Sequence, residues 1–87
     1  MYSKTTALVN PQGFHMRPAN EFVAEANKHD ATVTLVYQGK EIPGNSLMAI
    51  MAAGIKCGEE LEVKADGPEE QQAVDALVAF IESGMGD

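Results

Sequence analysis

The sequence predicts an α+β fold, a two-layer open-faced sandwich in which three helices cover one face of a four-stranded antiparallel sheet. Segments with apolar residues at alternate positions are interspersed with segments whose apolar residues recur at helical spacing, in the order β-α-β-β-α-β-α. The strand-like segments have one apolar and one polar face, so helices need to cover one face only. The length of 87 residues suits a single domain that spans residues 1–87.

A turn separates the first strand from the first helix. Residues 3–9 favour a strand and end at a turn-forming run of asparagine, proline and glycine over residues 10–13. Residues 16–28 carry an apolar face at helical spacing. Pro18 is compatible with the first turn of a helix, where its missing N–H costs no hydrogen bond. The helix is therefore expected to begin close to His15.

Three further strands and the last helix follow from the same patterns. Residues 32–38 alternate between apolar and polar side chains, residues 41–42 begin a short strand, and residues 60–66 alternate again. Proline and acidic side chains within residues 67–70 are typical of a helix start. The helix that follows has an apolar stripe made of Ala73, Val74, Leu77, Val78 and Ile81.

A short second helix is expected after Ser46, because its hydroxyl suits the N-cap position. Leu47, Ile50 and Met51 share one face of this helix, whereas Met48 points away from that face. Because the large apolar side chains of so short a helix cannot all point inward, Met48 is expected to be exposed.

Charge and cysteine content exclude several classes of protein. The net charge is -7, from 6 basic and 13 acidic residues, and such a chain is repelled by nucleic acid and by anionic membranes. Cys57 is the single cysteine, which suits a reducing compartment, and the N-terminal residues lack the apolar core of a signal peptide. We therefore expect a soluble cytoplasmic protein that binds no nucleic acid and does not insert into membranes. Without metal-ligand spacing or a glycine-rich phosphate loop, no cofactor is expected.

A histidine stands where the turn leads into the first helix. The leading N–H groups of a helix lack partners within it and, together with the helix dipole, favour an anion. The neutral imidazole of His15 is a nucleophile at cytosolic pH. Arg17, the only arginine, offers a planar array of donors suited to phosphate, while Gly13 and Pro18 support the backbone on either side. From spacing alone, an ordinary capping or surface histidine explains the pattern equally well.

The segment NPQGFHMRPA, residues 10–19, resembles the active-site segment of the HPr family, the histidine-containing phosphocarriers of the bacterial phosphoenolpyruvate-dependent sugar phosphotransferase system. The similarity extends along the whole chain, through its length, the order of its elements and the Ser-Leu-Met run that begins at Ser46. Phe14 and Met16 depart from the family, which more often has smaller aliphatic residues or alanine at these positions.

This resemblance implies a phosphoryl carrier rather than an enzyme. His15 would accept a phosphoryl group on its Nδ1 atom from phosphorylated Enzyme I and donate it to the IIA component of a sugar permease. Arg17 would stabilise the phosphohistidine and the transition state of transfer, because such a carrier mainly positions groups and offsets charge. A carrier that visits several partners in turn is expected to be a monomer.

Ser46 has two interpretations. The local one is an N-cap. The resemblance adds that some members of the family are phosphorylated at this serine to control carbon catabolism, so that HPr kinase/phosphorylase and a catabolite-control repressor become further partners. Asn45 precedes the serine here, where many regulated members carry lysine. An alternative to carriage is therefore a regulatory module that is switched at Ser46.

Apolar side chains near the histidine are expected to form a docking patch for partner proteins. Methionine suits such a patch because its flexible, polarisable side chain adapts to several partners. The residues assigned to the docking patch are Phe14, Met16, Leu47, Met48 and Met51.

An acyl carrier protein is the alternative from a different class. The run Asn45-Ser46-Leu47 is similar to the Asp-Ser-Leu motif that carries phosphopantetheine in those proteins. Asparagine replaces the aspartate, however, and the alternating segments 32–38 and 60–66 are incompatible with an all-helical fold.

Overall fold

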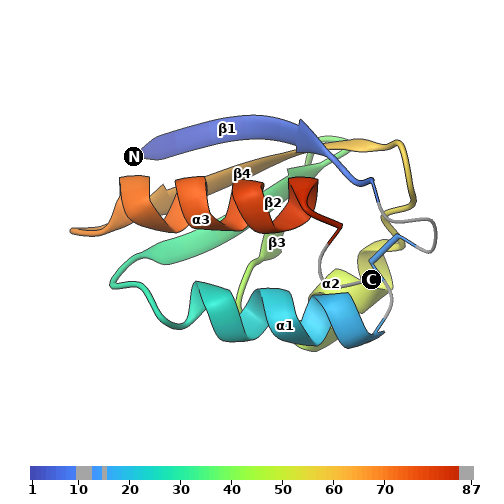
Figure 1. Ribbon diagram of the computed structural model, residues 1–87, viewed down its shortest axis with the longest axis horizontal. Coiled ribbons are helices and arrows are strands. Elements are labelled where there is room, and N and C mark those ends of the chain that lie inside the picture. Colours follow the sequence, from blue (N-terminus) through green and yellow to red (C-terminus); the bar gives the residue numbers. More distant parts are fainter. Residues whose placement is uncertain (10–12, 15, 85–87) are drawn as a thin grey trace.

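The computed structural model describes residues 1–9, 13–14 and 16–84, and within them the helices and strands follow the predicted order (Figure 1). The elements are β1 (Tyr2–Ala7), α1 (Met16–Ala26), β2 (Thr32–Tyr37), β3 (Lys40–Pro43), α2 (Leu47–Ala53), β4 (Glu60–Asp66) and α3 (Glu70–Glu82). No helix in these ranges combines the length and the apolar character needed to cross a bilayer.

The strands form one antiparallel sheet in the order β1-β4-β2-β3. β4 lies between β1 and β2, so that Val63 stands opposite Lys4 on one side and Leu35 on the other. β2 and β3 form a hairpin whose two turn residues, Gln38 and Gly39, have φ angles of 53° and 78°. Positive φ at both positions gives a turn whose twist matches that of the flanking strands.

One face of the sheet is buried, as the alternating pattern predicted. The buried strand residues occupy every second position of β2 and β4: Val33, Leu35, Tyr37, Leu61, Val63 and Ala65. The helices cover this face: α3 lies against β1 and β4, α2 lies beside β3, and α1 packs against both other helices (Figure 1). The predicted stripe of α3 is buried at all five positions. The α+β open-faced sandwich is thus confirmed.

The first strand ends two residues earlier than predicted. The prediction of residues 3–9 is replaced by Tyr2–Ala7, because Ala7 pairs with Glu60, the residue at which β4 begins. The N–H of Leu8 donates instead to the carbonyl oxygen of Glu59, at 3.2 Å, just before β4. Leu8 therefore leaves the strand ladder but stays tied to the connection that follows α2.

The first helix also ends two residues early, at Ala26 instead of residue 28. The N–H of Lys28 donates to the carbonyl oxygen of Glu25, three residues back instead of four, and this bond closes the helix with a tighter turn. The side chains of Lys28 and His29 both return to the Glu25 carboxylate, at 3.3 and 3.2 Å.

The topology gathers three segments at the end of the sheet where β1 finishes. Figure 1 shows the start of α1, the helix α2 and the connection from α2 to β4 at this end. α1 and α2 are also in direct contact. The start of α1, which follows His15 in the chain, therefore lies in the same region as α2, which follows Ser46.

Candidate functional site

The segment that leads into α1 is seated on the connection between α2 and β4, residues 54–59. The N–H of Phe14 donates to the carbonyl oxygen of Ile55 at 3.0 Å. Gly13 has a φ of 66°, and a Cβ atom placed there would lie 2.5 Å from the Ile55 carbonyl oxygen and 2.8 Å from the Cα of Lys56. Only glycine combines this conformation with so close an approach of two backbones.

The same connection holds the chain on the other side of residues 10–12. Leu8 donates its N–H to the carbonyl oxygen of Glu59 at 3.2 Å, and its own carbonyl oxygen accepts from the N–H of Gly58 at 2.8 Å. Residues 54–59 are therefore a shared support for the end of β1 and for the entry to α1.

His15, the predicted nucleophile, lies outside the described residues, as do residues 10–12 of the motif. α1 begins at Met16, the next residue in the chain. The prediction that the helix starts close to His15 is therefore confirmed. Pro18 lies in the first turn of α1 and is buried, where its missing N–H breaks no helical hydrogen bond.

Arg17 lies in the first turn of α1 with an exposed side chain. Lys4, Lys28 and Lys64 are each paired with a carboxylate, at 2.8, 3.3 and 2.7 Å, whereas Lys40 and Lys56 form no ion pair with a described residue. Arg17 forms no such ion pair within the part of the chain that the structure describes. Its guanidinium is thus left available for an anion, two residues after the histidine.

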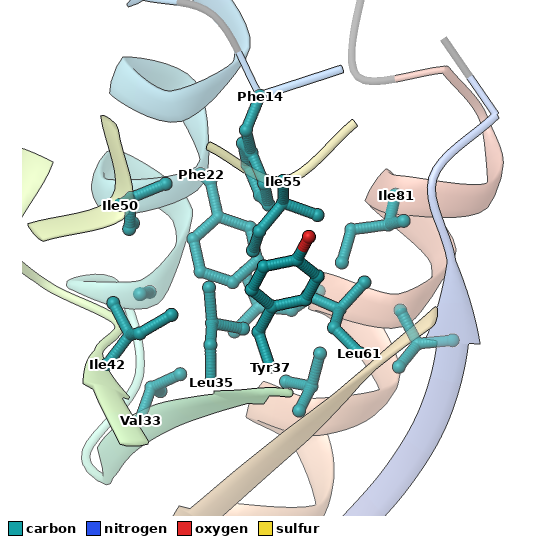
Figure 2. Packing of buried hydrophobic residues seen from close by; sticks show 14 of the residues in the cluster. Phe14, Phe22, Val33, Leu35, Tyr37, Ile42, Ile50, Ile55, Leu61 and Ile81 are labelled. Carbon is teal, nitrogen blue, oxygen red and sulfur yellow. The ribbon is translucent and has the colours of Figure 1, made fainter. Parts of the chain in front are cut away.

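The expectation that Phe14 belongs to an exposed docking patch is wrong. Only 5% of Phe14 is exposed, and its ring meets that of Phe22 edge to face, with centroids 5.4 Å apart and planes at 89° (Figure 2). Burying an aromatic ring in the core is more favourable than leaving it in water. Phe14 is therefore the anchor of the segment, whereas Met16, two residues on, is 64% exposed.

The residues of α2 divide between the core and the surface. Ile50 is fully buried and Leu47 is half-buried, as their shared helical face predicted. Met48 is 81% exposed, which confirms the expectation that it points away. Met51, which helical spacing groups with Leu47 and Ile50 and which is also assigned to the docking patch, is 37% exposed.

Ser46 caps α2, as predicted. Its backbone is extended, and its Oγ accepts a hydrogen bond from the N–H of Ala49 at 3.2 Å. Gly54 closes the other end in the left-handed conformation, with a φ of 66°. Both ends of this short helix are thus fixed by local interactions.

Sequence reasoning missed one polar pair beside the site. The hydroxyl of Tyr37 donates to Oε1 of Glu59 at 2.6 Å, and the same oxygen accepts from the N–H of Lys56 at 2.9 Å. The bond from Tyr37, together with that from Lys56, lowers the pKa of Glu59 below its ordinary value. The bond to Glu59 in turn raises the pKa of Tyr37. No local pattern could have revealed this pair, because its members are 22 residues apart.

Within the described ranges, no group of three or more histidine, cysteine, aspartate or glutamate side chains is arranged to hold a metal ion. The described groups at this end of the molecule include the exposed guanidinium of Arg17 and the N-terminus of α1.

A family model described as the PTS HPr component phosphorylation site matches residues 2–83 of the chain. The chain belongs to the HPr family. This is the family of phosphocarrier proteins of the phosphotransferase system, so the resemblance seen in the sequence is confirmed.

Individual members of the HPr family match over nearly the full chain. The phosphocarrier protein HPr of Haemophilus influenzae is 40% identical over 81 residues, which are 93% of this chain and 95% of that protein. The HPr-like protein Crh of Halalkalibacterium halodurans is 34% identical, over 94% of this chain and 98% of that protein. The crystal structure of HPr-C-His from Thermoanaerobacter tengcongensis has a TM-score of 0.95 and 34% identity, and it covers 100% of this chain and 98% of its own.

The contact of Gly13 with the Ile55 carbonyl yields a testable prediction for this HPr-family chain. Gly13→Ala is expected to lower the free energy of unfolding by about 2 kcal/mol or more, because a Cβ adds a backbone clash to the cost of a left-handed residue. Gly54→Ala is the matched control, since Gly54 has the same φ of 66° but open space around it. Urea unfolding of both variants measures the difference. If the free energy of unfolding falls equally in Gly13→Ala and Gly54→Ala, the clash at Gly13 is relieved without a cost in stability.

Proposed function

We propose that the chain accepts a phosphoryl group from phosphorylated Enzyme I on His15 and passes it to the IIA components of sugar permeases. The observation that carries the proposal is the exposed Arg17 in the first turn of α1, which forms no ion pair with a described residue and lies two residues after His15 in a chain of the HPr family. An acyl-carrier role is not supported, because the fold is a sheet covered by helices.

In the proposed step, a neutral imidazole nitrogen attacks the phosphorus atom while the bond from phosphorus to the donor breaks. Onward transfer reverses this exchange, so His15 is restored after each cycle and the protein acts as a carrier rather than as an enzyme. Arg17 supplies positive charge to the phosphoryl oxygens in the transition state and in the phosphohistidine. The N–H groups at the start of α1 add a favourable dipole.

We assign partner docking to the exposed apolar side chains of α1 and α2. Met16 and Met48 are 64% and 81% exposed, and Met51 and the half-buried Leu47 border Met48 on the same helix. The contact between α1 and α2 supports their use as one surface. Flexible methionine side chains suit a surface that must fit a donor and several acceptors in turn.

The proposed cycle takes place in the cytoplasm, with the chain acting as a monomer. Enzyme I and the IIA components must reach the same face of the carrier at different times, and a free monomer leaves that face open. Cys57 is an exposed free thiol, which is compatible with a reducing compartment.

A second candidate function is regulation at Ser46 by HPr kinase/phosphorylase, with a catabolite-control repressor as the partner that reads the modification. The half-buried Ser46 lies at the start of α2, two residues before Met48, which is 81% exposed. The similarity to an HPr-like protein Crh also supports this candidate. A phosphate there would place a charge of about -1.5 to -2 beside the proposed docking surface.

The central test is the transfer of labelled phosphate from phosphoenolpyruvate through Enzyme I. The wild-type protein is expected to take up label that is lost in acid, as phosphohistidine is, and His15→Ala is expected to take up none. The circular dichroism spectrum of the variant should match that of the wild type. Uptake of acid-labile label by a folded His15→Ala would overturn the proposal.

Arg17→Ala is expected to slow transfer by about 100-fold, because it removes a charge that stabilises the transition state. The free energy of unfolding should change by less than about 0.5 kcal/mol, since the side chain is exposed. Arg17→Lys should give an intermediate rate, because it retains the charge but loses the planar fork. The rate of phosphoryl transfer is measured by quenching the reaction at successive times. A wild-type rate in Arg17→Ala would show that Arg17 has no part in the mechanism.

Met48→Asp is expected to raise the KM for Enzyme I by about 10-fold, because a charge at the centre of a docking surface must be desolvated on binding. Its melting temperature should remain near that of the wild type, since Met48 is 81% exposed. Gln72→Asp, an exposed position on α3, adds the same charge elsewhere and serves as the control. An unchanged KM in Met48→Asp would exclude this part of α2 from docking.

Ser46→Asp is expected to slow phosphorylation of His15 by Enzyme I, while its melting temperature stays equal or rises slightly. A negative charge at the start of a helix is favourable by about 0.3–1 kcal/mol, so the change acts on docking and not on folding. Ser46→Ala removes the cap and should lower stability by about 1 kcal/mol without slowing transfer. Equal transfer rates in the two variants would leave Ser46 as a cap alone.

A further inference from the structure

Glu59 joins its own connection, residues 54–59, to two segments that are distant in the sequence. Its Oε1 accepts from the hydroxyl of Tyr37, the last residue of β2, at 2.6 Å and from the N–H of Lys56 at 2.9 Å. Its backbone carbonyl oxygen accepts from the N–H of Leu8 at 3.2 Å. One residue thus links the sheet, the connection after α2 and the end of β1.

The donor in this arrangement is firmly placed. Tyr37 is 9% exposed and its ring lies within the buried cluster, with the hydroxyl directed toward the end of the core where Phe14 and Ile55 lie (Figure 2). Two donors on one oxygen favour the charged form of the Glu59 carboxylate and lower its pKa. A charged acceptor makes the bond from Tyr37 stronger than one between neutral groups.

The connection that Glu59 holds contains two glycines in the left-handed region. Gly54 and Gly58 have φ angles of 66° and 85°, which glycine adopts without steric cost. Their neighbours are mostly exposed, apart from Ile55. The bond from Tyr37 to Glu59 therefore supplies a fixed point on the sheet for a connection with little regular structure.

Phe14 and Gly13 take their position from this connection. The N–H of Phe14 donates to Ile55, and Gly13 lies against the backbone of Ile55 and Lys56. Through these contacts, a displacement of residues 55–56 would move Phe14, the residue that precedes His15 in the chain. Small errors in the placement of a reacting group can lower a rate by as much as about 100-fold.

We propose that Tyr37 and Glu59 are positioning residues for phosphoryl transfer: they fix the connection 54–59 to the sheet and thereby orient the segment that carries His15. This inference rests on the proposed function at His15. Neither residue belongs to the docking surface assigned to α1 and α2, so their effect falls on kcat and not on the binding of Enzyme I.

The test compares kcat and KM for phosphorylation by Enzyme I, with phosphoenolpyruvate as the source of phosphate. Glu59→Ala is expected to lower kcat by about 10-fold with KM changed less than about twofold. Glu59→Gln keeps an oxygen that accepts from both donors and should retain most of kcat. Tyr37→Phe should lower kcat, and the double variant Tyr37→Phe/Glu59→Ala should be no slower than Glu59→Ala alone, because the two residues act as a pair.

A second measurement reports on position without any reaction. Hydrogen exchange of the Phe14 and Leu8 amides should be faster in Glu59→Ala than in the wild type, since both amides donate to the connection. Tyr37→Phe retains the buried ring, so it tests the proposal even if Glu59→Ala does not fold. Tyr2→Phe is the matched control: it removes another tyrosine–carboxylate bond, to Asp75 at 3.3 Å, at the opposite end of β1, and should leave kcat unchanged.

The outcomes separate this inference from the function on which it rests. If the wild-type protein takes up no phosphate from Enzyme I, the proposed function is overturned and the inference with it. If the wild type is phosphorylated and both Tyr37→Phe and Glu59→Ala have its kcat, the inference alone is overturned. A raised KM with an unchanged kcat also overturns it, because Glu59 would then be a docking residue.

Discussion

The apolar face of the sheet has to be shielded from water, and the placement of every helix follows from this requirement. Side chains such as Leu35 and Val63 are fully buried, and burial of each stabilises the fold by about 1.5–3 kcal/mol. α3 covers β1 and β4, α2 lies beside β3, and α1 closes the layer by packing on both. With the helices confined to one layer, the start of α1, the helix α2 and the connection 54–59 meet at one end (Figure 1).

At that end, burial and exposure alternate over a few residues. Phe14 is inserted into the core against Phe22, while Met16 and Arg17 face the solvent. The residue before His15, the proposed phosphoryl acceptor, is thus anchored in the core, and the two residues after it are exposed. Sites supported in this way by the packing of their neighbours are more accurately placed than sites on an unsupported loop.

Charge is distributed to match the chemistry of a phosphoryl carrier. A phosphohistidine adds negative charge to a chain whose net charge is already -7. Lys4, Lys28 and Lys64 are occupied by carboxylates, so they contribute little to an incoming anion. Under the proposed function, the guanidinium of Arg17, which forms no ion pair with a described residue, and the N-terminus of α1 would provide positive potential for the phosphoryl group.

The sequence by itself determined the helices and strands, because periodicity and capping are properties of neighbouring residues. The alternation of residues 60–66, the stripe of α3 and the Ser46 cap were all predicted, and so was the placement of Met48 at the surface. The motif around His15 and Arg17 likewise identified the family from its residues alone. The ends of β1 and α1 were off by two residues, since hydrogen bonds to Glu59 and Glu25 decide them.

Only the tertiary structure decided which residues of the site are buried and what supports them. Phe14 lies outside any regular element, so no periodicity in the sequence distinguishes a core anchor from a docking residue at that position. The contact of Gly13 with Ile55 and the bond from Tyr37 to Glu59 join segments that are far apart in the sequence, by 22 residues in the case of the bond. Such contacts form because folding brings those segments to the same end of the sheet. Residues that are neighbours in the sequence do not indicate which distant segments will meet there.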